Sequence, residues 1–379
     1  MNQKHSMDEL GDAGRPFASV YRVLWEAIKD AAFPGCAFGV LAGGKVALAD
    51  SLGRFTYEET APPVLAKTVF DVASVTKVAA TTAAAMVLWQ RGELDIEAPV
   101  GELLPGFLAG RSADDPARRV TLRHLLAHNS GLPGYVEFFR TLATAPELLH
   151  ALFELKIEAE PGTRAEYSDP GFILLGKALE AVTGEPLDAW VDREIFVPLG
   201  MDATRFCPLE TARPSIPPTE EDTWLRHRRI QGEVQDENAW VLGGVAGHAG
   251  LFSSVPDLLR FAGEILDAGK ATGRAQLYRP TTVEFFAERQ GPVGSSPALG
   301  WDTPSQESSA GQYFSPGSIG HLGYSGCSLW IDREAGVAAV LLTNRTWPDR
   351  KSQLIRQVRP AFHNAVREAL CGGAEARII

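Results

Sequence analysis

Ser74 and Lys77 lie three residues apart in the apolar segment FDVASVTKVAATTAAAMVLWQRGELD, residues 70–95. The apolar pattern predicts a helix over 74–90, and residues three apart on a helix share one face. A serine hydroxyl attacks a carbonyl only when a neighbouring base takes its proton. At the helix start, Ser74 would also lie beside unpaired backbone N–H groups that favour developing negative charge. The pair therefore has the residue types of a nucleophile and an adjacent base.

The same pair also has a purely structural interpretation. A serine that opens a helix is an ordinary N-cap, and about one Ser-x-x-Lys spacing is expected by chance in a chain of this size. The apolar surroundings of Lys77 argue for function, because lowering a lysine pKa from about 10.4 by ~2.4 units costs ~3 kcal/mol. This cost predicts a further group that relays the proton.

Tyr167, in the segment EYSDPGF, has the hydroxyl for such a relay. In the functional interpretation, its phenol moves a proton between Ser74 and the leaving group. In the structural interpretation, Ser168 or Asp169 caps a helix with Pro170 in its first turn, and Tyr167 is a packed aromatic residue. This segment alone favours neither interpretation over the other.

A third segment, SIGHLGYSGCSLWID, carries His321-Leu322-Gly323 at the start of a late strand. A strand edge beside a serine at a helix start would supply a second oxyanion donor through the Tyr324 backbone N–H. Gly323 would permit the close approach that this requires. The segment predicts an oxyanion hole made by the backbone N–H groups of Ser74 and Tyr324.

Together, Ser74-x-x-Lys77, Tyr167-Ser168-Asp169 and His321-Leu322-Gly323 resemble the three motifs of the serine β-lactamase and penicillin-binding-protein superfamily. The chain is most similar to the class C β-lactamase-like group, which includes D,D-peptidases, D-aminopeptidases and carboxylesterases. The resemblance extends over residues 17–370. It also includes the phrases LLAHNSGLPG (125–134), YSDPGFILLGKALEAVTGEPLDAWV (167–191), GGVAGHAGLFSSVPDLLRFA (243–262) and LLTNR (341–345).

The resemblance implies a serine hydrolase with its site in a cleft between two lobes. Ser74 would form an acyl-enzyme with an ester or an amide, such as a β-lactam, a D-amino-acid peptide or a carboxylic ester. Lys77 and Tyr167 would move the proton, with either of them as the acylation base. No cofactor and no metal is expected. A protein of the same fold that is acylated without turnover, or that only binds, is the alternative.

Two departures from the family pattern bear on substrate binding. Asp169 stands where family members often carry asparagine, and a carboxylate cannot donate a hydrogen bond to a substrate carbonyl. Asp169 is instead expected to pair with Lys77, which keeps the lysine charged and moves the base role to Tyr167. His321 replaces the lysine of a K-T-G triplet, which weakens binding of a substrate carboxylate, and Arg345 is expected to compensate in part.

The architecture predicted from the residue pattern is α/β of the α+β type, with an antiparallel sheet from both chain ends and an inserted helical lobe. Strands are expected at 37–41 and 45–52, joined by Gly43-Gly44, and at 321–332 and 336–344. Helices are expected at 17–32, 74–90, 120–128, 145–155, 170–183, 186–197, 255–268 and 351–370. The long connections 208–218 and 291–311 are expected to wall the site. One domain, 16–372, would divide into an α/β lobe (16–72 and 296–372) and a helical lobe (73–295), with flexible ends at 1–15 and 373–379.

Composition excludes several other classes of protein. The net charge of −11 opposes binding to nucleic acid, and the dense basic run 226–229 is interpreted as a solvated loop. The four cysteines have no metal-ligand spacing and no disulfide framework, and are expected to be reduced and mostly buried. No apolar run is long enough to span a membrane. Without a visible signal peptide the chain is expected in the cytoplasm, or in the periplasm or outside the cell if a leader has been removed.

Three further patterns compete for a function. His124 and His128 have the i, i+4 spacing of a helical zinc pair, but no glutamate follows His124 and no third ligand is evident. They are expected instead to pack between the lobes and to help end their helix. The glycine-rich run 243–250 lacks the Lys-Ser/Thr of a phosphate loop and is interpreted as a tight turn near the cleft. Ser325 misses the G-x-S-x-G pattern at its last position.

Overall fold

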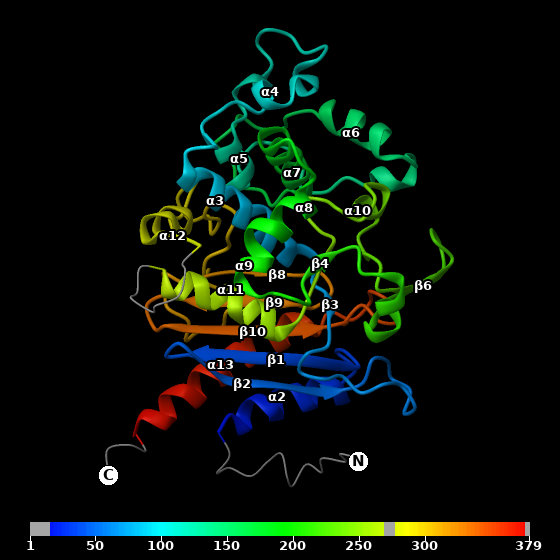
Figure 1. Ribbon diagram of the computed structural model, residues 1–379, viewed down its shortest axis with the longest axis vertical. Coiled ribbons are helices and arrows are strands. Elements are labelled where there is room, and N and C mark those ends of the chain that lie inside the picture. The colour runs from blue at the N-terminus through cyan, green and yellow to red at the C-terminus, as the bar shows by residue number, and fades with distance from the viewer. Residues whose placement is uncertain (1–15, 269–276, 376–379) are drawn as a thin grey trace.

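Both ends of the chain contribute strands to one antiparallel sheet of five strands, in the order β2-β1-β10-β9-β8 (Figure 1). The computed structural model describes residues 16–268 and 277–375. The strands are β1 (Gly35–Ala42), β2 (Lys45–Gly53), β8 (Ile319–Leu322), β9 (Ser328–Asp332) and β10 (Val337–Thr343). The predicted α+β class is confirmed, and the turn between β1 and β2 contains Gly43 and Gly44 with φ of 57° and 72°.

Alternation along the central strands divides the core into two layers. In β10, Val340 and Leu342 face one layer, while Ala339 and Leu341 face the other. Helices α2 (Ala18–Lys29) and α13 (Ile355–Glu375) cover the second layer, and α11 (Val255–Asp267) covers the first (Figure 1). Each large aliphatic or aromatic side chain buried here contributes about 1.5–3 kcal/mol. The sheet is therefore a rigid base for the loops that leave its edges.

The inserted lobe is mostly helical and lies beyond one face of the sheet (Figure 1). Its helices are α3 (Ala83–Arg91), α4 (Val100–Leu103), α5 (Leu122–Leu126), α6 (Ala145–Phe153), α7 (Asp169–Thr183), α8 (Leu187–Val191), α9 (Val197–Leu199), α10 (Glu237–Val241) and α12 (Pro280–Ala287). Two small sheets join the lobes. They comprise β3 (Phe70–Asp71), β7 (Leu251–Ser253) and β4 (Arg205–Phe206) in one, and β5 (Pro218–Asp222) and β6 (Arg228–Gln231) in the other.

Four predicted elements differ from the structure. The helix expected at 74–90 is a 3₁₀ turn, Ala73–Val75, and a π-helical turn, Lys77–Thr82, followed by α3. The strand expected at 321–332 is two strands, because the chain turns back at 323–327, where Gly326 has φ of 106°. The helix expected at 186–197 is interrupted by a π-helical turn, Asp192–Phe196, just before Pro198, which has no N–H to continue an α-helix. Helix α11, expected in the helical lobe, packs on the sheet.

The predictions for the chain ends and for the cysteines differ in part from the structure. Residues 1–15 and 376–379 lie outside the described residues, while 373–375, expected to be flexible, belong to α13. The four cysteines are free, but only Cys36 and Cys327 are buried, while Cys207 and Cys371 are exposed. The expectation that most are buried is therefore only half correct.

The interpretation of the basic run 226–229 as a solvated loop is only partly correct, because three of its residues are exposed but Arg226 is buried and the last two residues belong to a strand. The side chain of Arg226 is 1% exposed, and its Nε lies 3.0 Å from an Asp222 carboxylate oxygen. Arg228 and Arg229 begin strand β6 and form ion pairs with glutamates. A buried arginine requires such partners, so the run fixes the β5–β6 hairpin.

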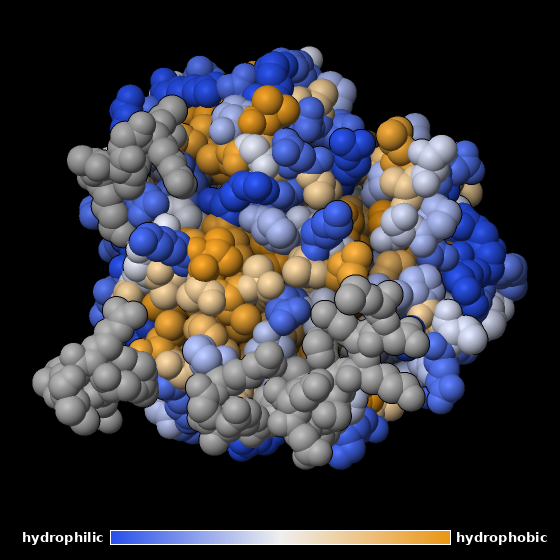
Figure 2. All heavy atoms as spheres, turned by 60° about the horizontal axis from the view of Figure 1, so that its bottom comes forward, coloured by the Kyte–Doolittle hydropathy of each residue, from blue (hydrophilic) through white to orange (hydrophobic). Residues whose placement is uncertain are grey.

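The outer surface at the sheet end is partly apolar. Edge strand β2 leaves Val46, Ala47 and Ala49 exposed. Figure 2 shows hydrophobic residues gathered on the face that this end of the molecule presents. Among the described residues, no helix combines the length and the apolar character needed to cross a membrane.

Candidate active site

The backbone around Ser74 is irregular. After β3 the chain forms a 3₁₀ turn, Ala73–Val75, then a π-helical turn, Lys77–Thr82, before α3 begins. Ala73 has φ of 47°, which is uncommon for a residue with a side chain. The Asp71 carboxylate accepts the Ala73 N–H at 2.8 Å at the start of this turn. Ser74 lies inside the turn, so the interpretation of Ser74 as an N-cap is wrong. The Ser74 side chain is left to face a cavity.

Lys77 is completely buried, and its ammonium has three acceptors. Nζ donates to Ser74 Oγ at 3.2 Å, to Asp169 Oδ1 at 2.6 Å and to the His248 carbonyl at 3.0 Å. Burial acts to lower the pKa of Lys77, but Asp169 and Tyr167 together outweigh it and hold the pKa above its usual value. An ammonium has no lone pair, so Lys77 in this state donates to Ser74 and cannot take its proton.

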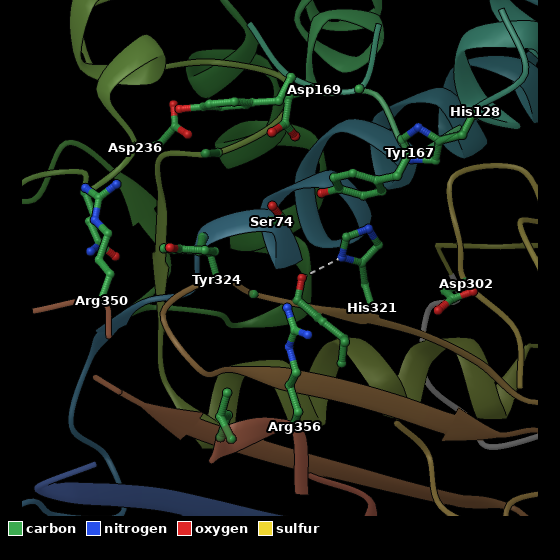
Figure 3. Close-up of a pocket in the computed structure, with 18 of the residues that line it drawn as sticks. Ser74, His128, Tyr167, Asp169, Asp236, Asp302, His321, Tyr324, Arg350 and Arg356 are labelled. Atoms are coloured by element: carbon green, nitrogen blue, oxygen red, sulfur yellow. Dashed lines mark hydrogen bonds between the residues drawn. The ribbon is translucent and has the colours of Figure 1, made fainter. Parts of the chain in front are cut away.

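Tyr167 reaches the same point from the loop before α7. Ser168 caps that helix by accepting the Gly171 N–H at 3.1 Å. Tyr167 therefore precedes the helix, and its side chain is not part of the helix surface. Lys77 Nζ lies 4.8 Å from the centroid of the Tyr167 ring. Figure 3 shows the phenol directed toward Ser74. Although the ring is open to the cavity, burial of the phenol raises its pKa to about 12, while hydrogen bonding with Lys77 and Ser74 acts in the opposite direction.

The turn after β8 approaches Ser74 from the sheet. A Cβ added to Gly323 would lie 2.3 Å from the Val72 carbonyl oxygen, so only glycine fits there. The Ser325 hydroxyl donates to the Asp71 carbonyl at 2.7 Å and joins the turn to the segment that carries Ser74. This contact places the backbone of Tyr324 at the cavity that Ser74 lines.

His321 is buried beside Tyr167, with 5.9 Å between ring centroids. Its Nδ1 lies 2.8 Å from the Leu322 carbonyl oxygen (Figure 3). Burial and the nearby Lys77 charge lower the pKa of His321 to about 3. His321 is therefore a neutral hydrogen-bonding group rather than a cation at this position.

Arg345 contacts the protein differently from what the sequence suggested. Its Nε donates to the Tyr324 carbonyl at 2.8 Å and its guanidinium also donates to the Ser352 carbonyl at 3.1 Å. Arg359, which the sequence analysis did not single out, donates to the Gly323 carbonyl. Both arginines hold the turn of the proposed oxyanion donor, so the hydrogen bonds of Arg345 favour a positioning role over binding of a substrate carboxylate.

His128 is another site residue that the sequence analysis did not assign. Its Nδ1 accepts the Ser168 N–H at 2.9 Å, and its ring lies 4.7 Å from the Tyr167 ring. His124 instead hydrogen-bonds with Thr121 at the start of α5. The two histidines thus have separate partners, and the described residues contain no group of three metal-binding side chains. In the sequence, His128 was marked by the phrase LLAHNSGLPG and by its spacing from His124, but neither assigned it to this site.

A cavity of about 1350 Å³ is lined by Ser74, His128, Tyr167, Asp169, His321, Tyr324, Arg345 and Arg359. Lys77 lies buried next to Ser74 and Asp169. Of the two connections expected to wall the site, 291–311 lines the cavity with residues such as Asp302, whereas no residue of 208–218 does. Trp224 and Asp236, later in the chain, form another part of the wall. In Figure 3, Asp236 and Asp302 lie on opposite sides of Ser74. The cavity is large enough for a substrate that extends to both sides of the serine.

Removing the partner of Lys77 tests the importance of this ion pair. We expect Asp169→Ala to lower the free energy of unfolding by about 3 kcal/mol, because it leaves a buried ammonium without its carboxylate. Urea denaturation measures this change. Glu160→Ala is the control, since Glu160 and Arg119 form an ion pair of similar length, 2.7 Å, that is about half exposed. An equal effect of the two substitutions would contradict the prediction.

Buried neutral histidines make stability depend on pH. The pKa of His321 and of His363 is lowered to about 3, and that of His128 falls well below its usual value, mainly because of burial. Between pH 6.5 and 3 the unfolded chain therefore binds protons that the folded chain does not, so the free energy of unfolding decreases as pH falls. Asp71, whose pKa burial raises to about 6, acts in the opposite direction and offsets part of the effect.

His363→Gln isolates one of these protons away from the cavity. Glutamine can keep the contact that His363 Nε2 makes with the Ser328 hydroxyl at 3.1 Å. We expect the proton uptake on unfolding between pH 6 and 4 to fall by up to about one proton. Denaturation curves at a series of pH values measure it. His150→Gln, at an exposed position, should leave the slope unchanged, and an unchanged slope in His363→Gln would refute the prediction.

The chain belongs to the beta-lactamase family, whose sequence profile matches residues 17–360. It is 29% identical over 352 residues to the N-acetylmuramyl-L-alanine amidase of Bacillus subtilis (strain 168), covering 83% of this chain and 78% of that protein. It is 32% identical over 305 residues to a protein of Salmonella paratyphi B named as a D-alanyl-D-alanine carboxypeptidase, covering 73% and 69%. These relatives are named as hydrolases, consistent with a serine hydrolase.

Solved structures establish the fold independently. EstCE1, a hydrolase with promiscuous acyltransferase activity, superposes with a TM-score of 0.73 at 24% identity over 92% of this chain and 97% of that chain. The octameric penicillin-binding protein homologue from Pyrococcus abyssi gives 0.72 at 21% identity over 95% and 78%. The resemblance seen in the sequence motifs is thereby confirmed at the level of family and fold.

Proposed function

We propose that this protein hydrolyses an amide or ester bond through an acyl-enzyme formed on Ser74. The observation that carries the proposal is that Lys77 Nζ lies 3.2 Å from Ser74 Oγ and 4.8 Å from the centroid of the Tyr167 ring, while Ser74 and Tyr167, far apart in the sequence, line one cavity. Their residue types supply a nucleophile, a fixed positive charge and a proton carrier.

In the acylation step, Ser74 Oγ attacks the substrate carbonyl carbon. With a pKa of about 12, the phenol of Tyr167 is protonated at neutral pH. Tyr167 therefore accepts the Ser74 proton as it passes its own proton to the leaving nitrogen or oxygen. The Lys77 ammonium stabilises the negative charge that develops on Ser74 Oγ. The proton count balances, because one proton leaves the serine and one reaches the leaving group.

The carbonyl oxygen becomes negative in the same step. The backbone N–H groups of Ser74 and Tyr324 are the proposed donors to it, with the turn of Tyr324 held by Arg345 and Arg359. In deacylation a water molecule attacks the acyl carbon in place of the leaving group. Tyr167 accepts a proton from this water as its own proton passes to Ser74 Oγ. The reaction then returns the free enzyme and a carboxylic acid.

An amide bond of a cell-wall peptide is the substrate class that we favour. The two curated relatives described above are named for the cleavage of amide bonds at a muramyl-L-alanine or a D-alanyl-D-alanine unit. Rapid β-lactam turnover is a weaker candidate, because Asp169 is engaged by Lys77 and His321 is neutral. Carboxylic esters remain useful assay substrates for the same chemistry.

Covalent labelling tests the nucleophile directly. After treatment with a fluorophosphonate, intact-mass spectrometry should show one adduct, and peptide mapping should place it on Ser74 because its hydroxyl is the activated one. Ser74→Ala is the control and should stay unmodified. A single adduct on another residue would refute the proposal. An acyl adduct from a substrate that never turns over would identify a protein that is acylated without hydrolysis.

A further inference from the structure

Asp236 presents one carboxylate oxygen to the cavity that Ser74 lines. Its Oδ1 is occupied, since it accepts the Ala239 N–H at 2.7 Å and lies 2.9 Å from His248 Nε2. Within the hydrogen bonds of the described residues, no donor is paired with Oδ2. The side chain is 21% exposed and lines the cavity (Figure 3). The second oxygen is therefore available to a bound molecule.

The carboxylate is ionised at neutral pH. Burial acts to raise the pKa of Asp236, but His248 and the Ala239 N–H lower it to about 2. A partly buried carboxylate with only one oxygen satisfied favours a donor from a ligand, because charge-assisted hydrogen bonds are stronger than neutral ones.

The arginines nearby do not neutralise Asp236. Arg350 forms ion pairs with Glu220 at 2.6 Å and with Glu237 at 2.5 Å, so two carboxylates already surround its charge. Arg140 is paired with Glu137 at 2.5 Å in the same way. Among these groups, four carboxylates, including that of Asp236, accompany two guanidinium groups, so negative charge is in excess around Asp236.

Aromatic side chains complete this wall. Tyr135 is 47% exposed and lines the cavity together with Asp236. Trp224, 43% exposed, lines the cavity as well, but the Arg140 guanidinium already lies 5.3 Å from the centroid of its ring. Burial and then the charge of Asp236 raise the pKa of Tyr135, which shows that the carboxylate acts on this phenol. The faces of tyrosine and tryptophan attract cations. A carboxylate beside an exposed tyrosine ring has the chemistry that binds an organic cation.

We infer that Asp236, with Tyr135, forms a binding position for a primary ammonium group of the substrate. The ligand class is an amino-acid or peptide derivative that carries a free amino group in the same molecule as the bond cleaved at Ser74. The inference rests on the proposed function, because it assigns a substrate group to the same cavity. An ammonium fits one free carboxylate oxygen, since it is a compact cation with three donors.

Two pairs of matched substrates test the inference without knowledge of the natural one. The first pair is p-nitrophenyl 6-aminohexanoate and p-nitrophenyl heptanoate, which differ by an ammonium on the acyl side. The second pair is 5-aminopentyl butyrate and hexyl butyrate, which differ on the leaving side. In the natural protein we expect the charged member of at least one pair to have a kcat/KM at least about tenfold higher.

Asp236→Asn should bring that ratio to within about twofold of one. Asparagine retains an oxygen that accepts the Ala239 N–H and loses the charge. A structural effect transmitted from His248 to Lys77 would slow both members of a pair equally and leave the ratio unchanged. The ratio therefore separates ammonium binding from a general loss of activity.

Asp302→Asn is the matched control. It removes a carboxylate from the same cavity on the other side of Ser74 and should preserve the ratio. No preference for charge in either pair, or an equal ratio in the natural protein and Asp236→Asn, would overturn the inference. Failure of the proposed function is distinguishable, because neutral esters would then be hydrolysed equally by the natural protein and Ser74→Ala.

Discussion

Ser74→Ala is expected to lower kcat/KM for p-nitrophenyl butyrate by about 10⁴-fold to 10⁶-fold, because it removes the atom that would form the acyl-enzyme. The cavity and the Lys77–Asp169 ion pair do not depend on this hydroxyl, so the variant should stay folded. Initial rates measured at several enzyme concentrations give the loss, and circular dichroism verifies the fold. Retention of more than about one per cent of the activity would contradict the proposed nucleophile.

Ser325→Ala is the control for this experiment. Ser325 lies in the turn near the cavity and nearly matches another serine-hydrolase pattern, but its hydroxyl donates to the Asp71 carbonyl. Losing that hydrogen bond costs about 1 kcal/mol, which corresponds to less than about tenfold in rate even if it is fully transmitted to the site. A loss as large as that of Ser74→Ala would point to Ser325 as the nucleophile.

The sequence predicted the sheet because its strands carry a strong local signal. The segments of β1 and β10 are apolar, lie near opposite ends of the chain and are bounded by turn residues. The turn at 323–327 was missed although it contains Gly323, Ser325 and Gly326, because the alternating pattern on both sides of it was taken as one strand. The need for glycine at 323 comes from the Val72 carbonyl, far away in sequence. Helix α11 was assigned to the other lobe for the same reason, because an amphipathic pattern does not identify its partner.

The candidate site likewise contains residues that could be predicted from the sequence and residues that could not. Ser74, Lys77 and Tyr167 have distinctive residue types in distinctive spacings, so they could be selected before any coordinates. The third acceptor of Lys77 is the backbone carbonyl of His248, which any residue would provide, and no sequence pattern marks it. Asp236 could not be predicted from the sequence, because only the structure shows that both of its hydrogen bonds are accepted by the same carboxylate oxygen.

The charge on Lys77 decides which group can move protons. Its partners hold it as an ammonium, so a mechanism in which the resting lysine is the base would first need a proton to leave a buried ion pair. A phenol with a high pKa does not need to be ionised when it accepts one proton while it gives up another. The structure therefore favours Tyr167 over Lys77 as the acylation base and makes Tyr167 the more informative residue to change.

Tyr167→Phe is expected to lower kcat by about 10²-fold to 10⁴-fold for an amide substrate, the range typical of a general acid–base group. Phenylalanine keeps the ring that lies 4.7 Å from His128 and 4.8 Å from Lys77 Nζ, so the loss reports on the hydroxyl. The loss should be at least about tenfold smaller for a p-nitrophenyl ester, since p-nitrophenolate departs without a proton.

Steady-state rates of Tyr167→Phe on an amide and on an ester with the same acyl group measure both effects. Tyr313→Phe, which removes an exposed phenol that does not line the cavity, controls for the substitution itself. An equal loss on the two substrates would mean that Tyr167 only activates Ser74 and that another group protonates the leaving atom. Amide hydrolysis within tenfold of the natural rate would instead return the base role to Lys77, and the ion pair with Asp169 would then have to open during each turnover.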